Sequence, residues 1–201
     1  KKVVAKVVKT DTSTELKQHV SKIKKLLTQR DCTVIDSGIE LARSLDNPAV
    51  FEELLKDCTI GKEGKLVTNK IFTGTGPAQP YLNYALLGMI AYAPKACAVV
   101  VTLRQSITRL DLSASELWHV DGLTHCTNLT SLDLSWCESL TDVSVLAGLK
   151  NLNSLNLGWC ESVTDVSVLA ELKNLTSLNL RACESVTDLS VLAGLKNLTS
   201  L

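Results

Sequence analysis

The chain has 201 residues, of which 45% are hydrophobic and 21% are charged. This composition excludes a disordered polymer, and the length is sufficient to bury a hydrophobic core. A membrane-spanning helix needs roughly 18 unbroken apolar residues, and the most apolar stretch, residues 85–98, is interrupted by Pro94 and Lys95. The sequence therefore predicts a soluble globular protein without a transmembrane segment.

Charge is balanced over the whole chain but is unevenly distributed. Residues 1–30 contain nine basic and two acidic side chains, a net charge of +7, so the remainder carries −7. A basic segment of this kind can contact nucleic acid or anionic lipid. No aromatic residue is interleaved with the lysines, as a base-stacking surface would require, and we favour a solvated helix face.

Residues 1–100 contain no repeat and predict a mainly helical domain. Thr12 and Glu15 have the spacing of a capping box ahead of a helix that extends to Leu27. Ser37 and Glu40 repeat this signal before a helix that extends to Leu45. The pair Asn47-Pro48 then predicts the start of a third helix, which continues through Leu55.

Residues 58–79 are rich in Gly, Thr and Lys and predict a connector, with a β-turn at residues 62–64. A further helix is expected from Pro80 to about Tyr92. The run 98–103, AVVVTL, then predicts a β-strand that opens the next domain. We recognise no family for residues 1–100, which we interpret as an N-terminal cap or a separate docking module.

The second half of the chain repeats every 23 residues. Residues 128–150, 151–173 and 174–196 are nearly identical, residues 107–128 form a more divergent first copy, and a further copy opens at Asn197. Each copy has the frame LxxLxLxxC, which predicts a short strand with alternate residues facing inward. The following apolar residues recur every three positions, which favours 3₁₀ or irregular turns. One repeat cannot bury its own apolar side, so the copies must stack.

These repeats resemble the leucine-rich-repeat family in its short, bacterial, internalin-like form. The segments TDVSVLAGLKNLTSL and TDVSVLAELKNLTSL carry the resemblance, which covers about residues 105–201. It implies an α/β fold: a curved solenoid over residues 101–201, with a parallel sheet on the concave side and 3₁₀ turns on the convex side. Because a solenoid needs its open end covered, we predict that the mainly helical residues 1–100 form the cap. The N-glycosylation sequons at Asn128, Asn174 and Asn197 coincide with the repeat consensus NLTSL. We interpret them as part of this consensus and not as glycan sites.

The repeats depart from the family at the position usually occupied by asparagine. Cys137, Cys160 and Cys183 stand there, with Ser115 in the first copy. The chain has seven cysteines and no CxxC pair, which predicts buried thiols in place of disulfides or a metal site and favours a reducing, cytoplasmic location. Redox sensing is the alternative, but a buried thiol without a basic neighbour has little thiolate character.

The outward strand positions, with the tryptophans that follow, form the predicted binding surface. Trp and Arg are enriched among interface hot spots, although the tryptophans could equally be consensus packing at the strand-to-turn edge. The predicted partner-binding residues are Arg109, Asp111, Asp133, Trp136, Asn156, Trp159, Asn179 and Arg181.

No residue constellation predicts catalysis, a cofactor or a metal. The turn at residues 74–77 lacks the Gly-Lys-Ser/Thr ending of a phosphate loop. His19, His119 and His125 are too dispersed for a metal site. His125 adjoins Cys126, but sequence neighbours rarely face one another and no orienting residue stands out.

The sequence thus predicts an interaction module that binds a protein or peptide partner. Residues 105–201 carry eleven acidic and five basic side chains, so nucleic-acid binding there is not expected. Three alternatives stay open: a sensor or scaffold part of a larger signalling enzyme, a repeat protein that self-associates end to end, and a contact with nucleic acid or membrane through the first thirty residues. The start at Lys1 and the stop at Leu201 within a repeat lead us to expect a fragment, from which a secretion signal could be missing.

Overall fold

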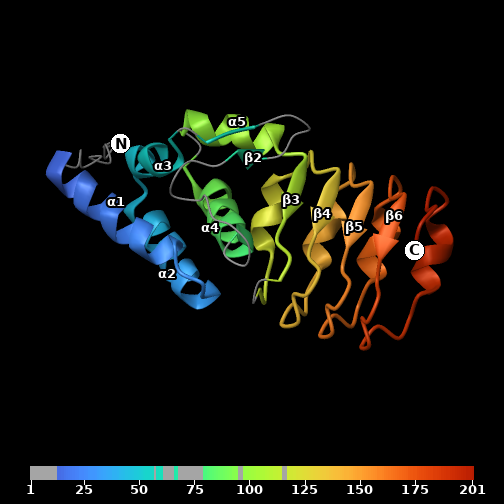
Figure 1. Cartoon of the computed structure of the whole chain (residues 1–201). Coiled ribbons are helices and arrows are strands. Elements are labelled where there is room, and N and C mark those ends of the chain that lie inside the picture. Colours follow the sequence, from blue (N-terminus) through green and yellow to red (C-terminus); the bar gives the residue numbers. More distant parts are fainter. Residues whose placement is uncertain (1–12, 57, 61–65, 68–78, 95–96, 115–116) are drawn as a thin grey trace, which may run out of the picture.

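A computed structural model describes residues 13–56, 58–60, 66–67, 79–94, 97–114 and 117–201. Helices occupy the N-terminal half, and a curved row of repeats follows (Figure 1). The predicted combination of a parallel-sheet solenoid with a helical N-terminal region is confirmed.

The first three helices are α1 (Ser13–Leu27), α2 (Cys32–Leu45) and α3 (Pro48–Leu55). The predicted start of α2 at Ser37 is wrong, because Asp31 already caps the helix by accepting hydrogen bonds from the backbone N–H of Thr33 (2.8 Å) and Val34 (3.2 Å). The predicted Asn47 cap is confirmed, since its side chain accepts from the Ala49 N–H at 3.0 Å. Thr12, the predicted cap of α1, lies outside the described residues.

The strands β1 (Thr59–Ile60) and β2 (Leu66–Val67) pair antiparallel within the predicted connector, and the predicted turn at residues 62–64 lies outside the described residues. Helix α4 (Gln79–Tyr92) begins one residue before the predicted start.

The segment predicted as the first strand of the solenoid is helix α5 (Ala98–Ser106). Val100, Leu103 and Ile107 are buried at helical spacing, whereas Val101 is 41% exposed. An alternating strand would place Val101 and Leu103 on the same face, so this burial pattern requires a helix in spite of the β-branched residues. The proposed domain boundary after residue 100 falls within α5.

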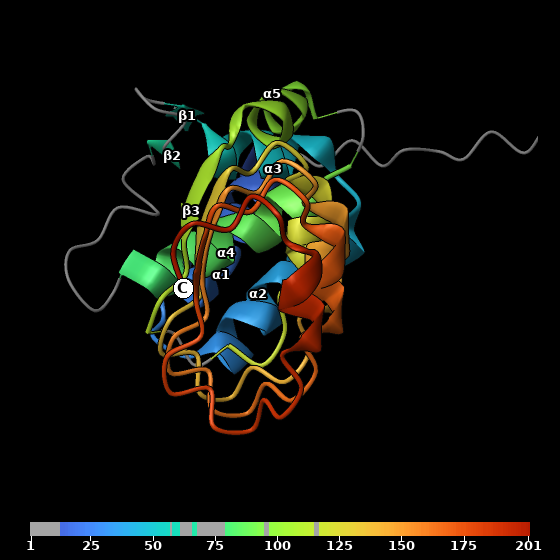
Figure 2. The same cartoon turned by 90° about the vertical axis from the view of Figure 1, so that its right-hand side faces the viewer.

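The repeats form a four-stranded parallel sheet in the order β3 (Arg109–Asp111), β4 (Ser131–Asp133), β5 (Ser154–Asn156) and β6 (Ser177–Asn179). The central residues of the strands, all leucines, are in register and buried. Opposite the sheet lie the 3₁₀ helices η3 (Asp121–His125), η4 (Ser144–Gly148), η5 (Ser167–Glu171) and η6 (Ser190–Gly194), seen as a separate layer in Figure 2. The 3₁₀ turns predicted for this side are confirmed.

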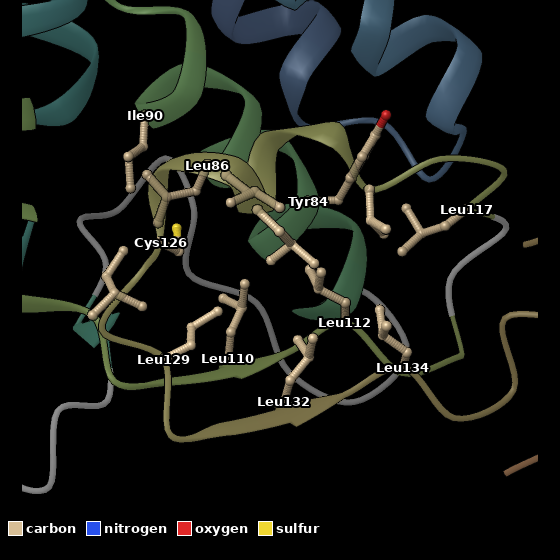
Figure 3. Close-up of a cluster of buried hydrophobic side chains, with 14 of the residues drawn as sticks. Tyr84, Leu86, Ile90, Leu110, Leu112, Leu117, Cys126, Leu129, Leu132 and Leu134 are labelled. Atoms are coloured by element: carbon tan, nitrogen blue, oxygen red, sulfur yellow. The ribbon is translucent and has the colours of Figure 1, made fainter. Parts of the chain in front are cut away.

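Helix α4 covers the first repeat. Leu86 and Ile90 point toward leucines of β3 and β4, including Leu110 and Leu132 (Figure 3). Gly122 of η3 permits this contact, because a Cβ atom there would lie 3.0 Å from Cγ of Leu87. The apolar end of the solenoid is therefore closed by a helix that belongs to the N-terminal half.

Replacing Leu86 by alanine should lower the free energy of unfolding by about 2–5 kcal/mol, because it opens a cavity between α4 and the first repeat. Val101→Ala is the control, with an expected loss below about 1 kcal/mol since this side chain is partly exposed. Urea unfolding measures both, and equal losses would contradict the assigned packing.

A polar cluster joins the helical half to the first repeat. The Tyr84 hydroxyl donates to Asp36 Oδ1 (2.6 Å) and lies 3.1 Å from His119 Nε2. Because the hydroxyl proton is directed to Asp36, the Nε2–H of His119 donates to the tyrosine oxygen. The other ring nitrogen, Nδ1, is buried without a hydrogen-bond partner and lies 3.7 Å from Asp121 Oδ2.

Protonation of Nδ1 would place an imidazolium between two carboxylates. The contact with Asp36 raises the pKa of His119, burial opposes this rise, and the charges of Asp36 and Asp121 add to it. Burial and the hydrogen bond to Asp36 raise the pKa of Tyr84 well above its usual range, so its hydroxyl remains a donor.

The stability contribution of His119 should be complete below its unfolded pKa of about 6.5. It should be lost as the pH rises through the higher folded pKa. We expect the gap in stability between the wild type and His119→Gln to shrink as the pH rises above about 6.5, measured by urea unfolding at each pH. A gap that does not change with pH would contradict the proposed protonation.

Candidate interaction surface

Four of the predicted binding residues form one row across the sheet. Asp111 pairs in register with Asp133, Asp133 with Asn156, and Asn156 with Asn179. Neighbouring strands lie about 4.8 Å apart, so these side chains are adjacent. Arg109 lies at the opposite end of β3 and is exposed.

Each side chain of this row also shapes the turn that follows its strand. The side-chain oxygens of Asp111 and Asp133 accept from the backbone N–H two residues later, at 3.0 and 2.9 Å. Asn156 and Asn179 do the same at 3.0 and 2.9 Å. The second carboxylate oxygen of Asp133 accepts from Asn156 Nδ2 at 3.1 Å. Sequence reasoning missed this structural role, although Asp or Asn before a turn is its usual signal.

The turns bring one residue of each repeat to a positive φ. These residues and their φ values are Ala114 (51°), Trp136 (63°), Trp159 (64°) and Ala182 (56°). Side chains other than glycine rarely adopt this conformation, which costs about 1–2 kcal/mol. The backbone is fixed by hydrogen bonds to the next repeat, such as that from the Trp136 N–H to the Gly158 carbonyl (2.9 Å).

The two tryptophans stack on each other at this position. Their ring centroids are 4.4 Å apart and the planes differ by 6°. Trp136 remains 49% exposed, whereas Trp159 is more covered. The two tryptophans therefore pack against each other, and Trp136 still presents a large aromatic surface to solvent.

The cysteine ladder lies in the core behind this surface. The thiols of Cys137, Cys160 and Cys183 donate to the carbonyls of Leu112 (3.3 Å), Leu134 (3.1 Å) and Leu157 (3.0 Å), each in the preceding repeat. All seven cysteines are buried and free. Burial raises the pKa of Cys160 to about 12 and that of Cys183 above its usual value.

The folded chain should resist alkylation, because the thiolate is the reactive form and burial disfavours it. At pH 8, iodoacetamide is expected to label Cys160 at least about tenfold more slowly in the native protein than in urea. Peptide mass mapping measures the rate at each cysteine. Rapid native labelling of Cys160 would show that the ladder is accessible.

The asparagines of the three sequons have structural hydrogen bonds. The side-chain amides of Asn128, Asn174 and Asn197 donate to the backbone carbonyls of Gln105, Lys150 and Lys173 at 2.7, 2.8 and 2.8 Å. Asn151, which belongs to no sequon, makes the same bond at 3.1 Å. This shared role supports the interpretation of the sequons as repeat consensus.

The remaining candidates for chemistry do not come together. Cys126 is buried, which raises its pKa to about 11, whereas its neighbour His125 is exposed. The turn at residues 74–77 lies outside the described residues. In the part of the chain that the structure describes, no three His, Cys, Asp or Glu side chains are grouped to hold a metal ion. Over the same residues, none of the helices combines the length and apolar character needed to cross a membrane.

Comparison with known families agrees with this geometry. The family model described as Leucine Rich repeat matches residues 125–147 and 148–170, two consecutive repeats. Residues 125–170 therefore match the leucine-rich-repeat family. Among solved structures it is similar to internalin C2 from Listeria monocytogenes, with 23% identity over 81% of this chain and 79% of that chain and a TM-score of 0.38. A search of curated proteins finds no match.

Proposed function

We propose that the repeat half binds a protein or peptide partner on its concave face. The observation that supports this most is where the repeats differ. The buried strand leucines of successive copies are identical, whereas the position two residues after the Asp/Asn row is Ser113, Ser135, Gly158 or Arg181. Ser113 and Ser135 are half-buried and Gly158 is buried, whereas Arg181 is exposed. The variation therefore puts one long cationic side chain on the surface of a single repeat, where it can serve recognition.

Arg181 is the centre of the proposed surface. Its side chain is exposed, and none of the described carboxylates forms an ion pair with it. A guanidinium group offers five donors in a fixed plane, which suits a carboxylate or backbone carbonyl of a partner. Asn156 and Asn179 lie beside it, with one oxygen each already used in the turn.

The substitution Arg181→Glu should reduce partner capture from lysate of the source organism by at least about tenfold, since it reverses the charge of a hot-spot residue. Arg181→Ser should give a smaller loss without harming the fold, because serine occupies this position in two other repeats. Capture followed by mass spectrometry is the measurement. Lys196→Glu on the other edge of the sheet is the matched control, since Lys196 is also exposed and forms no ion pair with a described carboxylate. Equal capture by the wild type and Arg181→Glu would refute the assignment.

We also propose that the protein works in a reducing compartment such as the cytoplasm. Three of its thiols donate hydrogen bonds in the core, a role that requires the reduced form. The same solenoid could serve as the sensor or scaffold part of a larger signalling enzyme, and in that case the concave face would bind the regulating protein.

A further inference from the structure

The two edges of the parallel sheet carry opposite charge. We define the acidic edge as residues 136–142, 159–165 and 182–188, which follow the strands and contain no lysine or arginine. Its carboxylates are Glu138, Asp142, Glu161, Asp165, Glu184 and Asp188. The opposite edge, ahead of the strands, carries Lys150, Lys173 and Lys196, one in each repeat.

The acidic edge keeps its charge at neutral pH. Asp142, Asp165 and Asp188 accept hydrogen bonds from the backbone N–H of a serine two residues later, at 2.7, 2.8 and 2.8 Å. These bonds lower the pKa of each aspartate. All six carboxylates are exposed, so their field extends into solvent.

The stacked tryptophans lie on this same edge. Trp136 and Trp159 each precede a glutamate by two residues. The fold does not require an indole here, because Ala114 and Ala182 occupy the equivalent positions with the same positive φ. A large aromatic side chain held in an unfavourable backbone conformation and left half exposed calls for a reason other than folding.

We propose that the Trp136–Trp159 stack, together with Glu138 and Glu161, which follow the two tryptophans by two residues, binds an arginine side chain of a basic peptide segment. The exposed indole surface attracts a cation through its quadrupole, and a guanidinium group can also stack on the ring plane. Glutamates of neighbouring repeats supply carboxylates for its N–H groups. Arginine should therefore bind better than lysine, and a neutral or acidic peptide should not bind.

This inference rests on the proposed role as a binding module, but it places the contact on the acidic edge and not on the row around Arg181. The two locations adjoin, because the Trp159 N–H donates to the Arg181 carbonyl at 2.7 Å, but they differ in charge. Arg181 would receive an acidic or carbonyl group of a partner, whereas the tryptophan stack would receive a basic one. A partner that used both would need a basic segment next to an acidic or polar one.

The test uses an amide-capped peptide of alternating glycine and arginine, its lysine and citrulline counterparts, and the full chain. Calorimetric titration at low and moderate salt gives the affinities. Trp136→Ala should weaken binding of the arginine peptide by about 3- to 30-fold. Its fold is expected to persist because alanine occupies this place in two repeats. Trp118→Ala is the matched control, since Trp118 is also exposed but lies outside the stack, and its affinity should equal that of the wild type.

Two results would overturn the inference. One is equal affinity of the wild type and Trp136→Ala for the arginine peptide, with circular dichroism showing both folded. The other is that the arginine and lysine peptides bind with equal affinity and that only Glu138→Gln and Glu161→Gln lower this affinity. This result would indicate unspecific charge attraction. Loss of partner capture in Arg181→Glu together with either result would leave the concave-face proposal standing. Unchanged partner capture by Arg181→Glu, together with weaker binding of the arginine peptide by Trp136→Ala, would reject only the concave-face proposal.

Discussion

Burial of the repeat leucines between neighbouring repeats is the constraint on which the structure depends. A single copy has one short strand and one 3₁₀ turn, too little to enclose its own apolar side chains. The five leucine positions that the copies share reach zero or near-zero exposure in residues 128–173, whereas Leu180 and Leu192 in residues 174–196 are only half-buried. Helix α4 supplies at the first repeat what a neighbouring copy supplies elsewhere, and so it is part of the solenoid core.

This dependence explains which parts of the fold could be predicted from the sequence. The strands and turns were predictable because the same 23-residue pattern occurs several times, so each copy confirms the interpretation of the others. Helix α5 occurs once, and its run of β-branched residues is typical of a strand. Only contacts far away in the sequence, which bury Val100 and Leu103 together, decide in favour of a helix. The same holds for α2, where Asp31 caps the helix well before the Ser37 signal.

The candidate surface could also be predicted only in part from the sequence. The periodicity identified the outward residues, and the sheet register places Asp111, Asp133, Asn156 and Asn179 in one row. Their bonds to the turn were not foreseen, because they follow from the backbone direction after the strand and not from residue type alone. The stacking of Trp136 on Trp159 was foreseeable from the spacing of one repeat. The half-exposure of Trp136 was not, since it depends on the small Ala114 in the preceding copy.

The turn that ends each strand links the fold to recognition. Asp or Asn fixes the turn, the turn fixes a positive φ, and that φ directs the next side chain to the edge of the sheet. Since the cost of this backbone conformation is met by hydrogen bonds between repeats, the side chain itself is free to change from alanine to tryptophan. The same construction repeats along the edge at a spacing of about 4.8 Å, so a change of one residue per repeat alters the surface without altering the core. Near-identical repeats can therefore differ in the surface that they present while sharing one way to fold.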